Sequence, residues 1–580
     1  MPEPSSAADL SGAPTDLDRG NSRTASQLRS RARVSSVLCC VAGGLLGLAI
    51  FHGPHLASGL QLIPGDELDA RFVAYVAEHV YQAALGNTSL PSPAFYFPRT
   101  GVLGYSDVHL LIAIPYSILR TIGLDILSAA GGAIIVLTIA TWLATFLLLQ
   151  VGLGFTPIAA LVGGFMFAFS SPKLNQMSHP LHQALVLIPA MAWCLVRFLE
   201  AAGEGRDRSA WRALGLFSLL FQLQLWTSFQ IAWIWAFELA IVTAIAALRR
   251  APRLACRRWV ESHGRGVCFL LLANVVALAP FLALHAPVAL EYGFREWSTV
   301  DASLPRPSSY LLMGNSFLWR AASNRLAYRV QLPLSWEQHL GLGIIGNVAL
   351  VTSFAWSVLQ LAIGEPTSLV QPRTPDGRRQ IVMLACLGSL SLFVLTLRIG
   401  DASPWRWVWE FLPGAAAIRT VSRYVLVSSL GVSLFLAYAI DVAIARLAAA
   451  RSLTRRLGAI ALAVMAFGLV AEQVGGPSSF DRSSSESRVA GLVEALKAHP
   501  ECSVFAIPPA DRGVWGGPLQ VDAMLASIET GRPTVNGYTS WAPRGWRLWD
   551  LTNPEYAKLV AEWSTSNGLG EVCMLRGPAP

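Results

Sequence analysis

Residues 34–51 read VSSVLCCVAGGLLGLAIF and residues 65–72 read GDELDARF, so an apolar run ends shortly before a cluster of three carboxylates and one arginine. An apolar run of about 18 residues is close to the length that crosses a bilayer. Because this run follows Arg29, Arg31 and Arg33 and lacks a small-residue cleavage site, it predicts an uncleaved membrane anchor with a cytoplasmic N-terminus.

The composition of the whole chain agrees with a membrane environment. Hydrophobic residues make up 53% of the sequence, charged residues only 14%, and the mean hydropathy is +0.47. Soluble domains carry about 25% charged residues, so the composition predicts a multi-pass membrane protein. The basic residues responsible for the net charge of +8 lie between apolar runs of membrane length. This placement favours membrane topology over nucleic-acid binding.

The apolar runs predict about eleven transmembrane helices. They begin near Val34, Ser128, Thr156, Leu181, Trp211, Ser228, Gly266, His339, Gln380, Tyr424 and Leu457. Residues 108–122 are apolar but short and contain Pro115 and Arg120, which predicts a helix lying at the membrane interface.

The positions of the arginines predict which side each connection faces. If residues 108–122 do not cross the membrane, the arginine-dense connections at 200–212, 249–265, 373–379 and 446–456 all share the cytoplasmic side with the N-terminus. The loop 52–127, the connections 172–180, 286–338 and 398–419, and the C-terminal segment then lie outside. GDELDARF is therefore expected at the outer face.

The last hundred residues differ from the rest and predict a separate small domain. Short strand-like runs at 502–507 and 571–575 alternate with helical patterns at 518–529 and 554–563, which indicates an α/β domain. Cys502 and Cys573 lie in the two runs and either pair or remain buried thiols. The predicted fold is an all-α polytopic membrane bundle (34–475) with a cytoplasmic disordered N-terminus (1–33) and an extracytoplasmic α/β domain (476–580).

GDELDARF allows two compatible interpretations. Asp66 could cap a helix with Asp69 as its third residue, followed by the apolar stripe Leu68, Phe72, Val76 and Val80. One acidic side chain suffices for capping, however, and three carboxylates at a membrane surface also suit chemistry. The chain contains no CxxC, HExxH or GxxxxGK[ST] motif, so soluble metalloenzyme and ATPase interpretations lose support.

The order of motifs along residues 34–476 resembles the GT-C superfamily of integral-membrane glycosyltransferases. In that superfamily an acidic motif follows the first span, as GDELDARFVAYVAEHVYQAALG does here, and interfacial stretches precede the second span, as PSPAFYFPRTGVLGYSDVHLLIAIPYSILRTIGL does. FAFSSPKLNQMSHPLHQALVLIPAMAWCLVRFLE is similar to the second exterior loop with its following span, WEQHLGLG to the return from the large loop, and PGAAAIRTVSRY to the approach to a late span. The WWDYG-type signature of oligosaccharyltransferase catalytic subunits is missing.

The resemblance implies an inverting transfer of a sugar from a polyprenyl-phosphate donor to a glycan, lipid or protein acceptor at the outer face. Asp66 matches the first acidic position of the family motif and is expected to act as the general base, with Asp69 as the next candidate. Glu67 is expected to point elsewhere on the helix. A lipid phosphate as leaving group calls for arginine. Arg419 and Arg423, four residues apart and so expected on one helical face, are the best candidates for binding it. Simple interfacial anchoring is an equally good interpretation of these two arginines.

Further polar residues are weaker candidates for the same site. Asp107 and His109 could join it, although Asp107 could instead cap the interfacial helix, and His179 and His182 could be structural. Glu238 lies well inside a predicted span, where an ionisable side chain usually faces a cavity or a partner. Whether a metal is used stays open, since Asp66 and Asp69 could hold Mg²⁺ or Mn²⁺.

Two other classes of function remain open. A non-catalytic scaffold with the same layout would be expected to have lost the acids, and a lipid or polysaccharide transporter to show internal repeats; the acids are present and no repeat is visible. In the C-terminal domain, residues 538–549 (YTSWAPRGWRLW) place Trp541, Trp546 and Trp549 among arginines. This pattern favours either covering of the site and contact with a glycan, or plain core packing.

Overall fold

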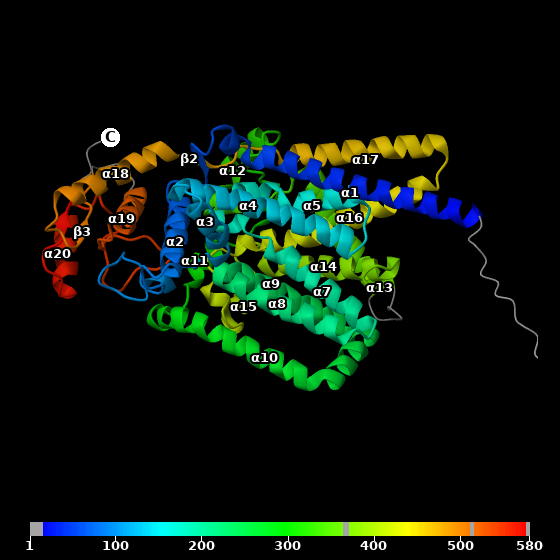
Figure 1. Cartoon of the computed structure of the whole chain (residues 1–580), viewed down its shortest axis with the longest axis horizontal. Coiled ribbons are helices and arrows are strands. Elements are labelled where there is room, and N and C mark those ends of the chain that lie inside the picture. Colours follow the sequence, from blue (N-terminus) through cyan, green and yellow to red (C-terminus); the bar gives the residue numbers. More distant parts are fainter. Residues whose placement is uncertain (1–15, 364–370, 511–515, 576–580) are drawn as a thin grey trace, which may run out of the picture.

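The computed structural model describes residues 16–363, 371–510 and 516–575, and most of them form a bundle of long, roughly aligned helices (Figure 1). Ten helices of this described part are long and apolar enough to cross a membrane, which confirms the predicted polytopic helical fold. They are built from α1 (Asp16–Ala57), α4 (Ile126–Leu147), α5 (Pro157–Ala168), α7 (Leu187–Gly203), α9 (Phe229–Leu248), α10 (Arg250–Tyr292), α13 (Gly343–Ile363), α14 (Pro375–Thr396), α16 (Val425–Ala448) and α17 (Ser452–Gln473).

The eleventh predicted span is present as α8 (Asp207–Thr227), but it is not among these ten helices. α8 packs along α7 and α9 in the bundle (Figure 1). Arg212, Gln222 and Gln224 lower its hydropathy, so its place in the bundle comes from its neighbours more than from its own apolar character.

The expected connection at 249–265 is also different in the structure. Residues 250–292 form the single helix α10, which has a kink at His263 (φ −123°, ψ 18°). Its first half is rich in arginine, and arginine is a good helix former, so the chain stays helical beyond its apolar part. α1 likewise begins at Asp16, within the N-terminal segment, and residues 1–15 lie outside the described residues.

Glycines allow α1 to lie close to the rest of the bundle. A Cβ atom at Gly43 would come 2.6 Å from the Trp142 ring of α4, and one at Gly47 would come 2.1 Å from the Phe169 ring. Small residues at such contacts are typical of packed membrane helices. Trp142, Phe165 and Phe169 belong to the main apolar core of the bundle.

The connections gather at two opposite ends of the bundle. At one end, the arginine end, Arg378 of α14 pairs with Asp441 of α16 (3.0 Å), and Arg373 approaches Glu200 of α7 (3.5 Å). At the other end, the loop end, lie the longer connections and the C-terminal domain, on the left of Figure 1. The arginine-rich connections at 200–212 and 446–456 lie at the arginine end, between α7 and α8 and between α16 and α17.

The loop end is built from short elements. The first connection carries β1 (Leu62–Pro64), α2 (Asp69–Ala84), the 3-10 turn η1 (Val102–Tyr105) and the 12-residue helix α3 (Leu110–Thr121) in the expected place of the interfacial helix. The later connections add α6 (Ser171–Asn175), η3 (Pro180–Gln183), α11 (Trp297–Ala302), η4 (Pro307–Leu311), α12 (Arg320–Val330), η5 (Ser335–Gln338), α15 (Trp405–Phe411), η6 (Ala415–Ala417) and η7 (Val421–Tyr424).

The C-terminal segment forms a small α/β unit at the loop end. It contains β2 (Ser479–Asp481), α18 (Arg482–Ala498), β3 (Phe505–Ala506), α19 (Gly517–Thr530), α20 (Tyr556–Ser566) and β4 (Cys573–Met574). β3 and β4 pair in parallel, and a disulfide joins Cys502 to Cys573 beside them. All four predicted elements are therefore present (β3, α19, α20 and β4), whereas α18 was not predicted.

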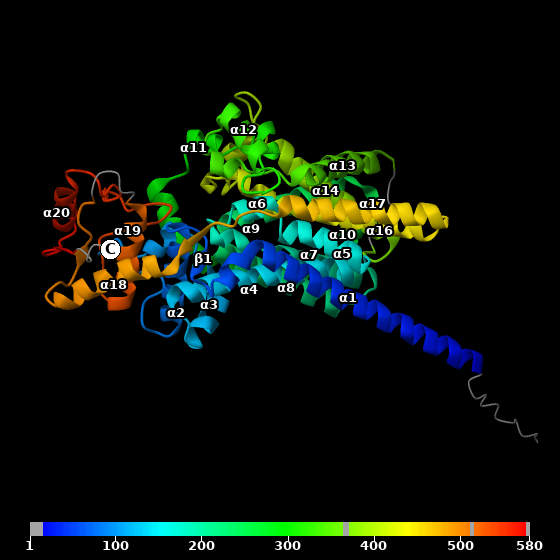
Figure 2. The same ribbon diagram turned by 90° about the horizontal axis from the view of Figure 1, so that it is seen from above.

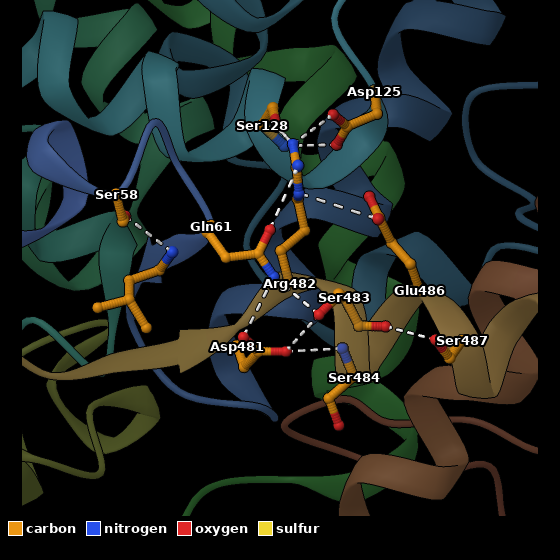
Figure 3. A network of polar contacts seen from close by, with 11 residues as sticks. Ser58, Gln61, Asp125, Ser128, Asp481, Arg482, Ser483, Ser484, Glu486 and Ser487 are labelled. Carbon is orange, nitrogen blue, oxygen red and sulfur yellow. Dashed lines mark hydrogen bonds and ion pairs between the residues drawn. The ribbon is translucent and has the colours of Figure 1, made fainter. Parts of the chain in front are cut away.

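The C-terminal domain is joined to the first connection by a strand pair and a polar network. β1 and β2 pair antiparallel, with Ile63 opposite Phe480. Arg482, just after β2, donates to Asp125 (3.1 Å) and Ser128 (2.5 Å) at the start of α4 (Figure 3). Gln61 donates to Asp481 (3.2 Å) and Ser483 (2.8 Å). Figure 2 shows α18 leaving this junction and extending away from the bundle.

Candidate active site

The start of α2 organises the acidic segment 65–72. The helix begins at Asp69, and its N-cap residue Leu68 makes no side-chain capping bond. The Oδ1 atom of Asp66 instead accepts hydrogen bonds from the amides of Leu68 (3.1 Å) and Ala70 (3.2 Å). Asp66 therefore caps the helix as predicted, but from two residues before the N-cap position. The prediction of Asp69 as the third helical residue was wrong, since Asp69 is the first.

Asp66 and Asp69 meet His179 from the second connection. One ligand atom from each of these three residues lies within 4.8 Å of the others. His179 Nδ1 lies 3.2 Å from Asp69 Oδ2, and its Nε2 lies 3.3 Å from Glu337 Oε1. His179 is 17% exposed and Asp69 is 27% exposed, so this cluster is accessible at the loop end.

Glu337 connects this cluster to the start of the late span. It accepts hydrogen bonds from Arg423 Nε (3.2 Å) and Arg423 Nη2 (2.5 Å), and from Gln176 (2.9 Å). Burial alone would raise the pKa of Glu337, but Arg423 and His179 outweigh burial and hold it well below its usual value. Glu337 therefore stays ionised. Glu337 was not predicted as a site residue, although it lies in the WEQHLGLG stretch that resembles a family motif.

The electrostatics of Asp66 differ from those of Glu337. Burial and then the neighbouring Asp69 carboxylate raise the pKa of Asp66, while the Ala70 and Leu68 amides and His179 oppose that shift. A carboxylate with a raised pKa binds a proton more readily than an ordinary aspartate. Asp66 thus has the property that a general base needs, at a position that the solvent can reach.

The two candidate arginines have different surroundings. Arg423 lies in η7, is buried and is paired with Glu337. Arg419 lies before η7 and is exposed; its backbone carbonyl accepts from Ser303 (2.7 Å). They do not share one face of an α-helix as the spacing predicted, because the chain turns between them. Burial and then the Arg419 guanidinium lower the pKa of Arg295 to about 10.

Asp107 and His109 lie beside the site but have structural partners. Asp107 accepts from the Phe229 amide (3.0 Å) at the start of α9, so it caps α9 and not the interfacial helix. Burial raises its pKa to about 6. The His109 ring packs edge-on against Phe72 (6.1 Å), and burial lowers its pKa to about 4, so it is neutral near pH 7. His109 has a left-handed backbone (φ 55°), a strained conformation for a histidine.

The structure separates His182 and Glu238. His182 is fully buried next to His179, with 6.0 Å between the ring centroids, and neither of its ring nitrogens has a hydrogen-bond partner among the described residues. Glu238 lies inside the bundle and accepts from Ser389 of α14 (3.1 Å). Glu238 therefore links two spans, whereas His182 backs the acidic cluster.

The remaining charges of GDELDARF face the C-terminal domain. Arg71 is fully buried and forms an ion pair with Asp522 of α19, and it also donates to the Pro518 carbonyl (3.2 Å). Arg488 of α18 bridges Asp522 (3.0 Å) and Glu67 (3.2 Å). The apolar stripe of α2, including Phe72 and Val76, is buried in the core of that domain. The prediction that Glu67 points elsewhere agrees with this arrangement.

The C-terminal domain also reaches the acidic cluster itself. The hydroxyl of Tyr538 donates a hydrogen bond to Asp69 Oδ1. Residues 538–549 were predicted to matter for their tryptophans, and Tyr538 was not predicted as a site residue. No local pattern distinguishes it, because its role depends on how the domain docks.

The donor set of the cluster fits a divalent cation. Asp66 and Asp69 offer carboxylate oxygens, which Mg²⁺ and Mn²⁺ prefer, and His179 adds a nitrogen, which suits Mn²⁺ or Zn²⁺ better than Mg²⁺. The distances between these atoms allow one ion to contact all three residues. Asp66 and Asp69, the predicted metal candidates, therefore lie together with one ligand that was not predicted.

Comparison with known proteins gives matches only among solved structures, because no family model and no curated protein matches the chain. An Archaeoglobus fulgidus oligosaccharyltransferase structure, solved with Zn and sulfate, is 12% identical with a TM-score of 0.47 over 86% of this chain and 62% of that one. The arabinofuranosyltransferase AftD from Mycobacteria is 15% identical (TM-score 0.46) over 88% of this chain and 32% of that one. ArnT from Cupriavidus metallidurans is 13% identical (TM-score 0.32) over 87% and 89%.

The chain spans less than two thirds of the first oligosaccharyltransferase structure and about a third of AftD.

Proposed function

We propose that the chain is a membrane glycosyltransferase that moves a sugar from a polyprenyl-phosphate donor to a glycan, lipid or protein acceptor at the outer face, with Asp66 as the general base. The observation that carries this proposal is the meeting of Asp66, Asp69 and His179 with the Glu337–Arg423 pair at the loop end. These residues come from four connections that are far apart in the sequence.

The proposed reaction transfers one proton, forms one bond and breaks one bond. The acceptor hydroxyl gives its proton to Asp66, and its oxygen attacks the anomeric carbon of the donor sugar. The bond between this carbon and the phosphate oxygen breaks, and the polyprenyl phosphate leaves with the electron pair. Attack from the face opposite the phosphate inverts the anomeric centre. The raised pKa of Asp66 supports its role as the base in this step.

Arg419 is the better candidate for binding the leaving phosphate. Its guanidinium is exposed, and no described residue forms a salt bridge with it, so it is free to bind an anion. Arg423 already donates two hydrogen bonds to Glu337. It is therefore proposed to hold Glu337, and through Glu337 His179, next to the acidic pair.

A divalent cation, if bound, would be held by Asp66, Asp69 and His179 and would neutralise charge on the donor phosphate. Asp69 is proposed to orient His179 in either case, since its Oδ2 lies 3.2 Å from the ring. Asp107, His109, His182 and Glu238 are proposed to support this site or the bundle through their contacts and not to react themselves.

The proposal is tested by transfer in proteoliposomes. Purified chain is given a panel of polyprenyl-phosphate sugars with a radiolabel in the sugar, together with a cell-envelope extract as acceptor. Label moving into a non-lipid or glycolipid product, and failing to move with Asp66→Asn, is the expected result. Equal transfer by both proteins would remove Asp66 as the base.

The same assay separates the two rival classes. A transporter would move the intact labelled lipid across the bilayer without releasing its sugar, which a membrane-impermeant periodate treatment detects. A non-catalytic scaffold would leave the label on the lipid and on its original side with every donor.

A further inference from the structure

The segment 538–549 of the C-terminal domain lies next to the acidic cluster. The Tyr538 hydroxyl donates to Asp69, and the Tyr538 ring packs edge-on against Phe72 of α2, with centroids 5.5 Å apart. Burial and then the Asp69 carboxylate raise the pKa of Tyr538 far above neutral pH. The hydroxyl therefore keeps its proton and remains a donor to Asp69.

Two of the three tryptophans in this segment are already used for packing. Trp541 lies under the Arg295 guanidinium (3.6 Å) and against the Tyr292 ring (5.1 Å). Trp546 is buried, and its Nε1 donates to the Val535 carbonyl (2.8 Å). These two residues fix the segment in place, and neither offers a free aromatic face.

Trp549 is different because it remains on the surface. Its side chain is 45% exposed, and its ring stacks on Tyr538 with centroids 5.7 Å apart and planes 28° apart. An exposed indole thus stacks directly on Tyr538, the residue that donates to Asp69. Arg419, also exposed, is close enough to oppose the rise in the Tyr538 pKa.

The docking of the domain makes this surface rigid. The buried Arg71–Asp522 pair, the Arg488 bridge and the β1–β2 pair all join the domain to the segment that carries Asp66 and Asp69. A binding surface held in this way loses little entropy when a ligand arrives. The aromatic pair and the carboxylates therefore keep a fixed relation to each other.

We infer that Trp549 and Tyr538 form the acceptor subsite, where a sugar ring of the acceptor stacks on the exposed indole and presents a hydroxyl toward Asp66 and Asp69. Sugar rings carry apolar C–H faces that pack on aromatic rings, and their hydroxyls suit the carboxylates and the Arg419 guanidinium. This inference rests on the proposed function, because only a transferase has an acceptor. It restricts the acceptor to a carbohydrate.

The test measures carbohydrate binding without any transfer. Full-length protein in lipid nanodiscs is mixed with methyl glycosides of arabinofuranose, galactofuranose, mannopyranose and glucopyranose, and saturation-transfer NMR records which ring protons contact the protein. At least one glycoside should bind to the wild type, and Trp549→Ala should bind it about fivefold more weakly or worse. Trp407→Ala is the matched control, because Trp407 is 70% exposed and lies on α15 outside the site.

Each outcome has one meaning. Failure of every glycoside to bind the wild type, or equal binding by Trp549→Ala, overturns the subsite. Loss of binding in Trp407→Ala to the same extent also overturns it, since general surface adhesion would then explain the signal. Tyr538→Phe should retain glycoside binding because it keeps the ring. Absence of sugar transfer with every donor would instead refute the proposed function while the binding result stands on its own.

Discussion

The segment GDELDARF has two faces with opposite properties. Asp66 and Asp69 lie on the side that meets His179 and Tyr538, where they are partly exposed and where burial and then the Asp69 carboxylate raise the pKa of Asp66. Glu67 and Arg71 face the C-terminal domain, where Arg71 and Asp522 are 0% and 1% exposed and form an ion pair, and where Glu67 pairs with Arg488. Buried ion pairs position the domain, whereas two neighbouring carboxylates repel each other, and the perturbed pKa that results is typical of catalytic sites.

Neighbouring substitutions on the two faces should separate them most strongly. Asp66→Asn removes the proposed base and should lower the transfer rate by about 10²- to 10⁴-fold. Glu67→Gln removes only a partly exposed ion pair with Arg488 and should change the rate by less than about twofold. Initial rates with the labelled donor compare the two variants. Equal losses would show that the faces are not functionally distinct.

The docking face should dominate stability. Arg71→Met leaves Asp522 buried with one partner fewer and should lower the free energy of unfolding of the docked domain by about 3–5 kcal/mol. Limited proteolysis between the bundle and the C-terminal domain, together with thermal melting, measures this effect. In the double variant Arg71→Met/Asp522→Asn the stranded charge is gone, so part of the loss should be recovered. A single variant that melts like the wild type would contradict the docking account.

The pH dependence of transfer should report the repulsion between Asp66 and Asp69. Asp66 accepts a proton only when ionised, so its raised pKa places the loss of activity on acidification at a higher pH than for an ordinary aspartate. Asp69→Asn removes the neighbouring charge and should move this acid limb to lower pH, while the rate falls about tenfold because the base is weaker. In Glu67→Gln the limb should stay in place; an unmoved limb in Asp69→Asn would argue against coupling of the pair.

The smallest effect is expected away from both faces. Glu238→Gln keeps an oxygen that accepts from Ser389, so stability should change by less than about 1 kcal/mol and transfer by less than about twofold. A large loss of transfer with normal melting would instead place Glu238 in the catalytic site, for which the sequence made it a candidate.

Much of the fold could be predicted because membrane helices can be recognised in a sequence by their length and hydropathy. Ten of the eleven predicted spans are among the long apolar helices of the described residues. The polar α8, the helical stretch before His263 of α10 and the start of α1 at Asp16 differ from the prediction. In the C-terminal domain, the sequence pattern located α19, α20 and the two strands β3 and β4. α18 was missed because its sequence, RSSSESRVAGLVEALKA, opens with serines that are weak helix formers.

The site could be predicted only in part, for a different reason. Asp66 and Asp69 lie close together because they are near in sequence, and His179 was named because it lies in the second loop. Glu337 and Tyr538 join them through tertiary packing, so no spacing in the sequence announces them. Arg419 and Arg423, in contrast, are near in sequence but have separate surroundings, because the chain turns into η7 between them.

The central claim is that the Asp66 face is where the donor reacts. Cryo-electron microscopy of the full chain in nanodiscs with a short polyprenyl phosphate tests it most directly. The account predicts density for the phosphate at the loop end, within hydrogen-bonding distance of Arg419 and facing Asp66 and Asp69. Phosphate density at the arginine end of the bundle, or between helices far from this acidic pair, would contradict it.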